Sequence, residues 1–105
     1  MENRLSVTLN GEKCYDILFE TSFESLPDEL LKMYDSSRKL CIITDSNVSA
    51  LYADEVSRIL SAGFDNVSVF EFPAGEESKN LMTVTAVYRF LLENNFNRRD
   101  VIIAL

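Results

Sequence analysis

Lys39-Leu40-Cys41-Ile42-Ile43-Thr44 is a run of six residues in which the four central positions are apolar. A continuous apolar run of this length is typical of a strand that is buried on both faces, as in a parallel sheet. Val101-Ile102-Ile103-Ala104-Leu105 has the same character and predicts a second fully buried strand. Residues 66–70 predict a third strand between these two, so the central and C-terminal parts of the chain point to one parallel sheet.

Two amphipathic helices are predicted between these strands. Their apolar residues recur at spacings of three and four, which places them on one face of a helix. In the first helix these residues are Val48, Leu51, Tyr52, Val56, Ile59 and Leu60; in the second they are Leu81, Val84, Val87, Tyr88, Leu91 and Leu92. We expect Gly63 to end the first helix in a left-handed conformation. Tyr52, Tyr88 and the phenylalanines are expected to be core residues.

The order strand–helix–strand–helix–strand over residues 39–105 is the βαβαβ unit of a doubly wound sheet with right-handed crossovers. The fold class is therefore α/β: an N-terminal β-hairpin followed by half of a doubly wound, Rossmann-like parallel sheet. Because the chain stops at the end of a buried strand, we expect residues 1–105 to be a single partial domain of a longer protein.

The N-terminal residues show a different pattern. Residues 5–9 and 15–19 alternate apolar and polar side chains around Asn10-Gly11, which predicts an antiparallel hairpin. A helix should follow, capped by Thr21 or Ser22 and regular only from about Pro27. We expect the hairpin and the parallel sheet to share one core.

Composition excludes several classes of protein. The 105 residues carry a formal net charge of −7, which repels nucleic acid and anionic membranes. No signal peptide and no apolar stretch of membrane-spanning length is present. Cys14 and Cys41 are expected to be reduced, packed thiols of a cytoplasmic protein. Without histidine and without C-x-x-C, the chain offers no zinc site and no catalytic histidine.

Polar residues follow the strand ends, where ligands bind in open α/β sheets. Asp45 follows the first buried strand and could accept hydrogen bonds from a ribose diol, and Asn47 could both donate and accept. Asp45, Ser46 and Asn47 are equally favoured helix caps, so a structural role is the alternative.

The segment Pro73-Ala74-Gly75-Glu76-Glu77-Ser78-Lys79-Asn80 follows the next strand. Pro73 and Gly75 suit a tight turn, and Ser78 suits the N-terminus of a helix, where backbone N–H groups favour anions. Glu76 and Lys79 can project from one side of the first turn toward a sugar or a phosphate. The alternative is a capped helix with a solvated charge pair. No nucleophile–base pair is visible, so the residues indicate binding rather than catalysis.

These motifs resemble the N-terminal third of the 3-dehydroquinate synthase family. The resemblance rests on Cys41-Ile42-Ile43-Thr44-Asp45-Ser46-Asn47-Val48, on Phe72 to Leu81 with its P-x-G-E-x-x-K signature, and on Phe96 to Leu105. Related sugar-phosphate cyclases share the motifs, and glycerol-dehydrogenase-like enzymes share the fold. The alternative from a different functional class is a small non-catalytic α/β interaction module.

The resemblance implies an NAD-dependent enzyme of the shikimate pathway that converts a seven-carbon keto-acid phosphate into 3-dehydroquinate and phosphate. The cofactor-binding positions that it implies are Asp45, Asn47, Ala74, Gly75, Glu76, Glu77, Ser78 and Lys79. It places the divalent metal (zinc or cobalt), its ligands, the substrate-binding residues and the glycine-rich pyrophosphate loop outside this chain. The chain alone is therefore expected to be inactive, with no catalytic residue of its own, and the complete enzyme is expected to be a cytoplasmic homodimer.

Overall fold

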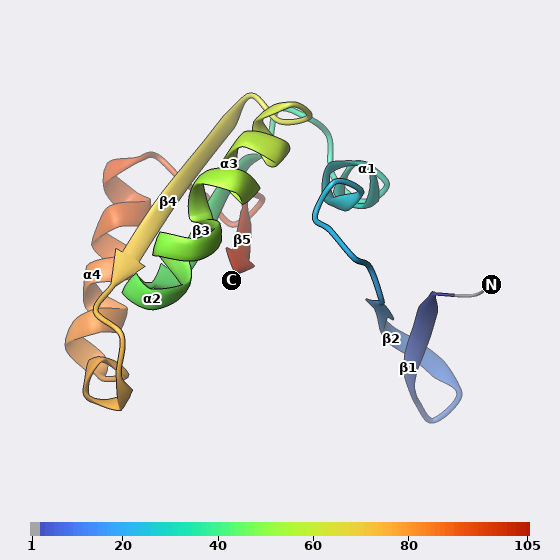
Figure 1. The fold of residues 1–105 in the computed structure, drawn as a ribbon, viewed down its shortest axis with the longest axis horizontal. Helices are drawn as coiled ribbons and strands as arrows, with labels where there is room; N and C mark the ends of the chain where they lie inside the picture. Colours follow the sequence, from blue (N-terminus) through green and yellow to red (C-terminus); the bar gives the residue numbers. More distant parts are fainter. Residues whose placement is uncertain (1–2) are drawn as a thin grey trace.

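The computed structural model describes residues 3–105 and contains two separate sheets. The larger sheet has three parallel strands, β3 (Lys39–Asp45), β4 (Asn66–Phe72) and β5 (Val101–Ala104), in the order β4-β3-β5. The smaller is the antiparallel pair β1 (Arg4–Leu9) and β2 (Glu12–Leu18). This arrangement confirms the predicted α/β class, with a hairpin preceding a βαβαβ unit (Figure 1).

The buried core lies on one face of the parallel sheet. Leu40 and Ile42 of β3 are fully buried there against Val56 and Leu60 of α3 (Asp54–Ser61). α4 (Leu81–Glu93) packs on the opposite face, where Phe90 meets Phe70 of β4 with ring centroids 5.4 Å apart. Side chains alternate between the two faces of a strand. The helices therefore cover both faces of the sheet, as a doubly wound fold requires (Figure 1).

The helix that follows β3 is not a regular α-helix. It consists of α2 (Ser46–Val48), a π-helical segment (Ser49–Ala53) and α3. The expectation that Leu51 and Tyr52 face the core is wrong, because Leu51 is 70% exposed and Ala53 is buried instead. A π segment adds a residue to the turn and so rotates the following side chains around the helix axis.

Gly63 ends this helix for a reason other than the predicted one. Among the described glycines, only Gly11 and Gly75 have a positive φ, so the left-handed conformation expected at Gly63 is wrong. A Cβ at Gly63 would lie 3.1 Å from Pro27 Cβ and 3.3 Å from Leu31 Cδ1. The absence of a side chain thus allows α1 (Leu26–Leu31) to pack closely against the end of α3.

α1 itself is shorter than predicted. Its N-cap is Ser25, which makes no side-chain capping hydrogen bond, so neither Thr21 nor Ser22 caps the helix. Pro27 lies in the first turn, as the sequence predicts, because the first helical positions need no N–H donor.

The hairpin forms with the predicted turn but does not join the core. Asn10 and Gly11 have φ values of 53° and 83°, as a tight two-residue turn requires. None of the buried core residues belongs to β1 or β2, so the expectation of one shared core is wrong. An ion-pair cluster attaches the hairpin to α1: Arg4 bonds Asp16 of β2 at 2.6 Å and Glu29 of α1 at 3.1 Å.

Several other side chains predicted to be packed are exposed. Ile102 of β5 is 54% exposed, so this strand is not fully buried. Tyr88 of α4 is 63% exposed, and the free thiol of Cys14 lies at the surface. Cys41 is buried as expected, and burial raises the pKa of its thiol. Among helices in the described part of the chain, none has the length and apolarity to cross a membrane.

Candidate cofactor site

The two turns that carry the predicted site residues leave the sheet side by side. β3 and β4 are parallel neighbours, and their register pairs Asp45 with Phe72 at the carboxyl ends of both strands. The turn after Asp45 and the turn after Phe72 therefore start at the same edge of the sheet. Ligands bind at this edge in open α/β folds.

Asp45 caps the helix that follows β3. Its Oδ1 accepts a hydrogen bond from the backbone N–H of Val48 at 2.8 Å. Within residues 3–105 its other carboxylate oxygen makes no hydrogen bond. The side chain is half-buried at the sheet edge, so this second oxygen can accept from a ligand while the first holds the helix.

A hydrogen bond across the strand ends joins the two turns. The backbone N–H of Ala74 donates to Ser46 Oγ at 2.9 Å, between residues 28 positions apart in the sequence. Sequence reasoning treated Ser46 only as one of three possible caps and missed this role. The available signal was the position of a small hydroxyl residue directly after the last residue of a buried strand.

The turn from Pro73 to Asn80 differs in detail from the prediction. Gly75 has φ 120° and ψ 154°, a conformation that disfavours any residue with a Cβ, so a glycine is required here. Residues Glu76–Ser78 form a single 3-10 turn, and α4 starts only at Leu81. Its N-cap is Asn80, whose Oδ1 accepts from the backbone N–H of Thr83 at 3.0 Å, so the expectation that Ser78 starts the helix is wrong.

Glu76 and Lys79 do project from one side of this turn. Lys79 Nζ lies 3.1 Å from Glu76 Oε1, and the two side chains are 66% and 88% exposed, respectively. A pair this exposed contributes little to stability. Both side chains can therefore turn toward a bound ligand. The same geometry also fits the alternative, a charge pair that contacts only solvent.

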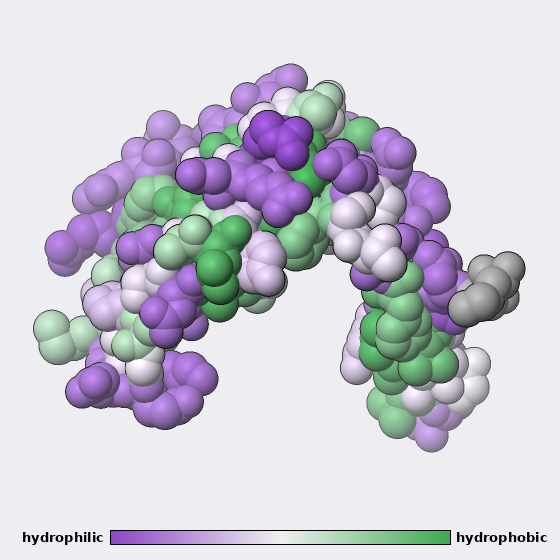
Figure 2. Space-filling model, viewed as in Figure 1, coloured by the Kyte–Doolittle hydropathy of each residue, from purple (hydrophilic) through white to green (hydrophobic). Residues whose placement is uncertain are grey.

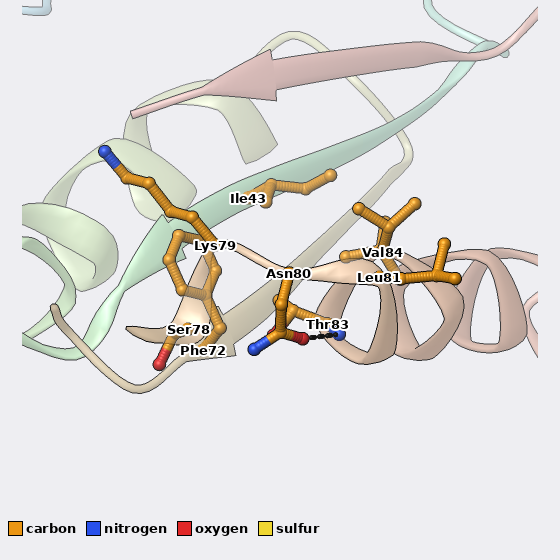
Figure 3. A pocket seen from close by; sticks show the side chains of 9 residues that line it. Ile43, Phe72, Ser78, Lys79, Asn80, Leu81, Thr83 and Val84 are labelled. Carbon is orange, nitrogen blue, oxygen red and sulfur yellow. Dashed lines mark hydrogen bonds between the residues drawn. The ribbon is translucent and has the colours of Figure 1, made fainter. Parts of the chain in front are cut away.

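An apolar groove of about 650 Å³ opens beside this turn (Figure 3). Its wall comes from the sheet through Ile43 and Phe72 and from the start of α4 through Leu81, Val84 and Val87. Lys79 and Asn80 also line it, but the Asn80 amide is already bonded to the backbone of Glu77 and Thr83. Sequence reasoning assigned the apolar residues to the core alone. An apolar groove of this size suits a flat organic ligand such as a nucleobase.

The structure thus brings some of the predicted residues together but not all. Asp45 and Ala74 belong to the joined turns, and Gly75, Glu76 and Lys79 extend from them. Asn47 is exposed on α2, and the hydrogen bond that joins the two turns is made by Ser46 instead. No cluster of three or more metal-binding side chains occurs among the residues that the structure describes. Ligand binding by these residues stays a prediction.

Comparison with known proteins identifies the relatives of this chain, although no protein-family model matches it. Two curated proteins are 3-dehydroquinate synthase of Streptococcus suis (strain 05ZYH33), 45% identical over 92 residues, and that of Streptococcus mutans serotype c, 44% identical over 103 residues. These matches cover 87% and 97% of this chain. The resemblance to 3-dehydroquinate synthase is confirmed.

The chain spans 26% of the Streptococcus suis 3-dehydroquinate synthase and 28% of the Streptococcus mutans enzyme. The 3-dehydroquinate synthase of Streptococcus pneumoniae (strain Hungary19A-6) is 42% identical over 92 residues, with the same 26% share. The homologues are enzymes, and this chain corresponds to about a quarter of each.

A solved structure supports the fold independently. The crystal structure of 2-deoxy-scyllo-inosose synthase, complexed with carbaglucose-6-phosphate, NAD+ and Co2+, matches 73% of this chain with a TM-score of 0.62. The match covers 21% of that protein at 24% sequence identity, so it shows a shared fold rather than a shared activity.

Proposed function

We propose that this chain is the NAD-binding segment of a 3-dehydroquinate synthase. The complete enzyme would convert 3-deoxy-D-arabino-heptulosonate 7-phosphate to 3-dehydroquinate and phosphate in aromatic amino-acid biosynthesis. The observation that carries the proposal is the Ser46–Ala74 hydrogen bond, which joins the turn of Asp45 to the turn of Glu76 and Lys79 at one sheet edge. Homologues named for this activity, 45% and 44% identical to this chain, supply the identity of the ligand.

The groups present fit the adenosine end of the dinucleotide. The second oxygen of Asp45 would accept from ribose hydroxyls while the first keeps capping the helix. Glu76 would accept from the same sugar, and Lys79 would attend a phosphate or a sugar oxygen. The apolar groove beside Phe72 would receive the adenine ring.

The remaining predicted positions contribute in other ways. Gly75 lets the backbone approach the ligand because it has no Cβ, and Ala74 and Ser78 would act through their backbone. Asn47 and Glu77 are exposed at the same edge and would make polar contacts with the sugar–phosphate part.

Catalysis requires residues beyond these. NAD supplies hydride acceptance and return, and in the complete enzyme a divalent metal (zinc or cobalt) would bind ligands outside this chain. We therefore propose that residues 1–105 are inactive alone and that the complete enzyme is a cytoplasmic homodimer acting on a small molecule.

A sister cyclase is the second candidate, because 2-deoxy-scyllo-inosose synthase has the same fold. The homologues at 42–45% identity favour 3-dehydroquinate synthase over it. A non-catalytic interaction module has no relative in its favour among these proteins.

The test is NAD binding by a full-length enzyme that carries this segment, measured by calorimetry. Asp45→Ser keeps a capping oxygen but removes the second acceptor, whereas Asp45→Ala removes both. Both variants should bind NAD at least about tenfold more weakly, corresponding to one hydrogen bond to a charged group. Only Asp45→Ala should also lose stability. Glu76→Ala and Lys79→Ala should weaken NAD binding without changing the melting temperature.

Arg58 provides the matched control. Its side chain is 68% exposed on α3, away from both turns, and Arg58→Ala should leave NAD binding unchanged. If the Asp45, Glu76 and Lys79 variants all bind NAD like the unsubstituted enzyme, these residues return to capping and solvated-surface roles and the proposed site is wrong.

A further inference from the structure

The turn between β4 and α4 lies at the surface of the molecule. Its 3-10 segment contains no buried residue, and Gly75, Glu76, Glu77 and Lys79 are all exposed. Figure 2 shows hydrophilic side chains over this turn, at the lower left, where the chain leaves β4 in Figure 1. Because few buried contacts hold such a segment, its conformation depends on its hydrogen bonds.

The backbone of the turn is bonded to itself. The N–H of Ser78 donates to the carbonyl of Gly75 at 3.1 Å, and the N–H of Lys79 donates to the carbonyl of Glu76 at 3.0 Å. These two bonds close the 3-10 turn, but they do not attach it to the sheet or to α4. The attachment must come from bonds at the two ends of the turn.

One side chain at each end supplies such a bond. At the start, Ser46 Oγ accepts from the backbone N–H of Ala74 at 2.9 Å. At the end, Asn80 Nδ2 donates to the backbone carbonyl of Glu77 at 2.6 Å. The same Asn80 amide accepts from the backbone N–H of Thr83 at 3.0 Å through its Oδ1 (Figure 3). Asn80 therefore joins the middle of the turn to the first turn of α4.

This bridge requires the side chain of asparagine. The backbone N–H of Thr83 calls for an acceptor and the carbonyl of Glu77 for a donor, and a carboxamide carries both on two separate atoms. An ionised aspartate caps a helix equally well but has no donor. A serine hydroxyl can cap the helix, but it is a single, shorter group that does not span both partners.

We infer that Asn80 is a positioning residue for the cofactor-binding turn and acts through Glu76 and Lys79. The inference rests on the proposed function. Glu76 and Lys79 flank Glu77, so the bond to the Glu77 carbonyl fixes the segment that carries both charges. Their own ion pair is too exposed to orient them strongly. The Asn80 bridge thus reduces the ordering that NAD would otherwise have to impose on binding.

Asn80→Ser separates the bridge from the helix cap. The serine oxygen still accepts from the backbone N–H of Thr83, so the melting temperature of the 105-residue chain should stay close to that of the unsubstituted chain. The Glu77 carbonyl loses its donor, and the amides of Ser78 and Lys79 should exchange about fivefold faster, the effect of one neutral hydrogen bond. Hydrogen exchange followed by NMR measures this without any cofactor.

Cofactor affinity is then measured by calorimetry on a full-length enzyme that carries this segment. Asn80→Ser should raise the NAD dissociation constant about two- to fivefold, because only molecules with an ordered turn bind tightly. In an enzyme that already carries Glu76→Ala and Lys79→Ala, the same substitution should leave the constant unchanged, since the side chains that Asn80 positions are gone. A residue that acts through others gives this non-additive result.

Asn94→Ser is the matched control. Asn94 Nδ2 donates to the backbone carbonyl of Phe90 at 2.8 Å, at the opposite end of α4 from the turn. The control removes the same kind of bond from the same helix. It should leave both the exchange of the Ser78 and Lys79 amides and the NAD dissociation constant unchanged.

Two results would overturn the inference. Unchanged exchange of the Ser78 and Lys79 amides in Asn80→Ser would show that the bridge does not hold the turn. An equal loss of NAD affinity with and without Glu76 and Lys79 would show that Asn80 contacts the cofactor itself. Failure of the proposed function looks different: the amides exchange faster in Asn80→Ser, but no substitution at Asn80, Glu76 or Lys79 changes NAD affinity. The bridge would then stand, and its role toward a cofactor would fall with the proposed function.

Discussion

Removing the hydroxyl of Ser46 should loosen the turn after β4 without unfolding the protein. Ser46 Oγ accepts from the backbone N–H of Ala74 at 2.9 Å, and the described residues supply this N–H with no other partner. In Ser46→Ala the N–H must bond water or stay unpaired. Since Ala74 is half-buried, water can reach it, so the lost bond is worth about 1 kcal/mol.

The global stability change should be smaller than this local loss. Ser46 is the first residue of α2, and alanine has the higher helix propensity, by up to about 0.5 kcal/mol. The net change in the free energy of unfolding is therefore about 0.5–1 kcal/mol, close to the scatter of surface substitutions. A melting curve would show only this net change, a shift of about 2–5 °C, and would not locate it at Ala74.

Amide hydrogen exchange at Ala74, followed by NMR, is the decisive measurement. A loss of about 1 kcal/mol corresponds to roughly a fivefold fall in local protection. Ser46→Thr retains a hydroxyl and should retain the protection, whereas Ser61→Ala removes an exposed hydroxyl at the end of α3 and should have no effect. Equal exchange of the Ala74 amide in the unsubstituted chain and in Ser46→Ala would refute the coupling of the two turns.

Four other outcomes are expected. Gly63→Ala should destabilise the chain by about 1–3 kcal/mol in urea unfolding, because its Cβ would meet α1 at 3.1 Å, and an unchanged midpoint would contradict that close contact. Asn80→Ala should cost about 1 kcal/mol by removing the N-cap of α4, and Asn80→Ser should restore most of it. The Ser6 hydroxyl, with Lys13 and Arg4, holds the pKa of Asp16 well below the usual value of 3.8. The ionised Asp16 carboxylate therefore contributes fully to stability above pH 3.8, and this contribution is lost as the pH falls through the lower pKa of the folded state. An NMR titration of the Asp16 carboxyl with its midpoint at or above 3.8 would disprove this. Finally, the 105-residue chain, which has only three glycines and no glycine-rich phosphate loop, should bind NAD at millimolar concentrations or weaker, and micromolar binding in calorimetry would contradict this.

The sequence predicts the sheet well because burial on both faces leaves a local signal. Lys39–Asp45 contains a continuous apolar run and Val101–Ala104 is one, and both form parallel strands close to the predicted bounds. Burial of β5 is harder to predict, because it depends on the elements that pack beside this strand. β3 covers one edge of β5 within the described residues, and Ile102 stays exposed although its neighbours in the sequence are apolar.

The helix after β3 shows where pattern reasoning fails. Leu51 and Tyr52 fit a 3.6-residue period as well as any residue of this helix, yet the π-helical segment turns Leu51 outward and Ala53 inward. A period assumed constant along a helix cannot report a local change of winding. The sequence gives little signal of this change of winding, because alanine is an ordinary residue at both core and surface positions.

At the candidate site, the sequence predicts which polar residues lie at the strand ends but not which of them form hydrogen bonds with each other. Asp45 lies at a strand end, as the sequence predicts, because its charged side chain ends the apolar run. The bond between Ser46 and Ala74 joins residues that follow different strands, so only the register of β3 with β4 reveals it. Ser78 and Asn80 both suit an N-cap, but Ser78 lies within the 3-10 turn Glu76–Ser78, so Asn80 caps α4.

The strand order places the predicted cofactor-binding residues at different distances from the crevice of the sheet. In the order β4-β3-β5, the chain passes from β3 to one neighbour and then crosses to the other, so the order reverses at β3. The crevice of an open α/β sheet lies outside the carboxyl ends of the strands at such a reversal. Asp45 ends the central strand and borders this crevice, whereas Glu76 and Lys79 follow β4, one strand away from it. A dinucleotide that contacts all three residues would therefore place its adenosine end over β3 and β4 and extend past Asp45 toward β5. Asp45 is then the residue that both halves of the site share. The Asp45→Ser variant therefore separates ligand binding from helix capping more sharply than any change at Glu76 or Lys79.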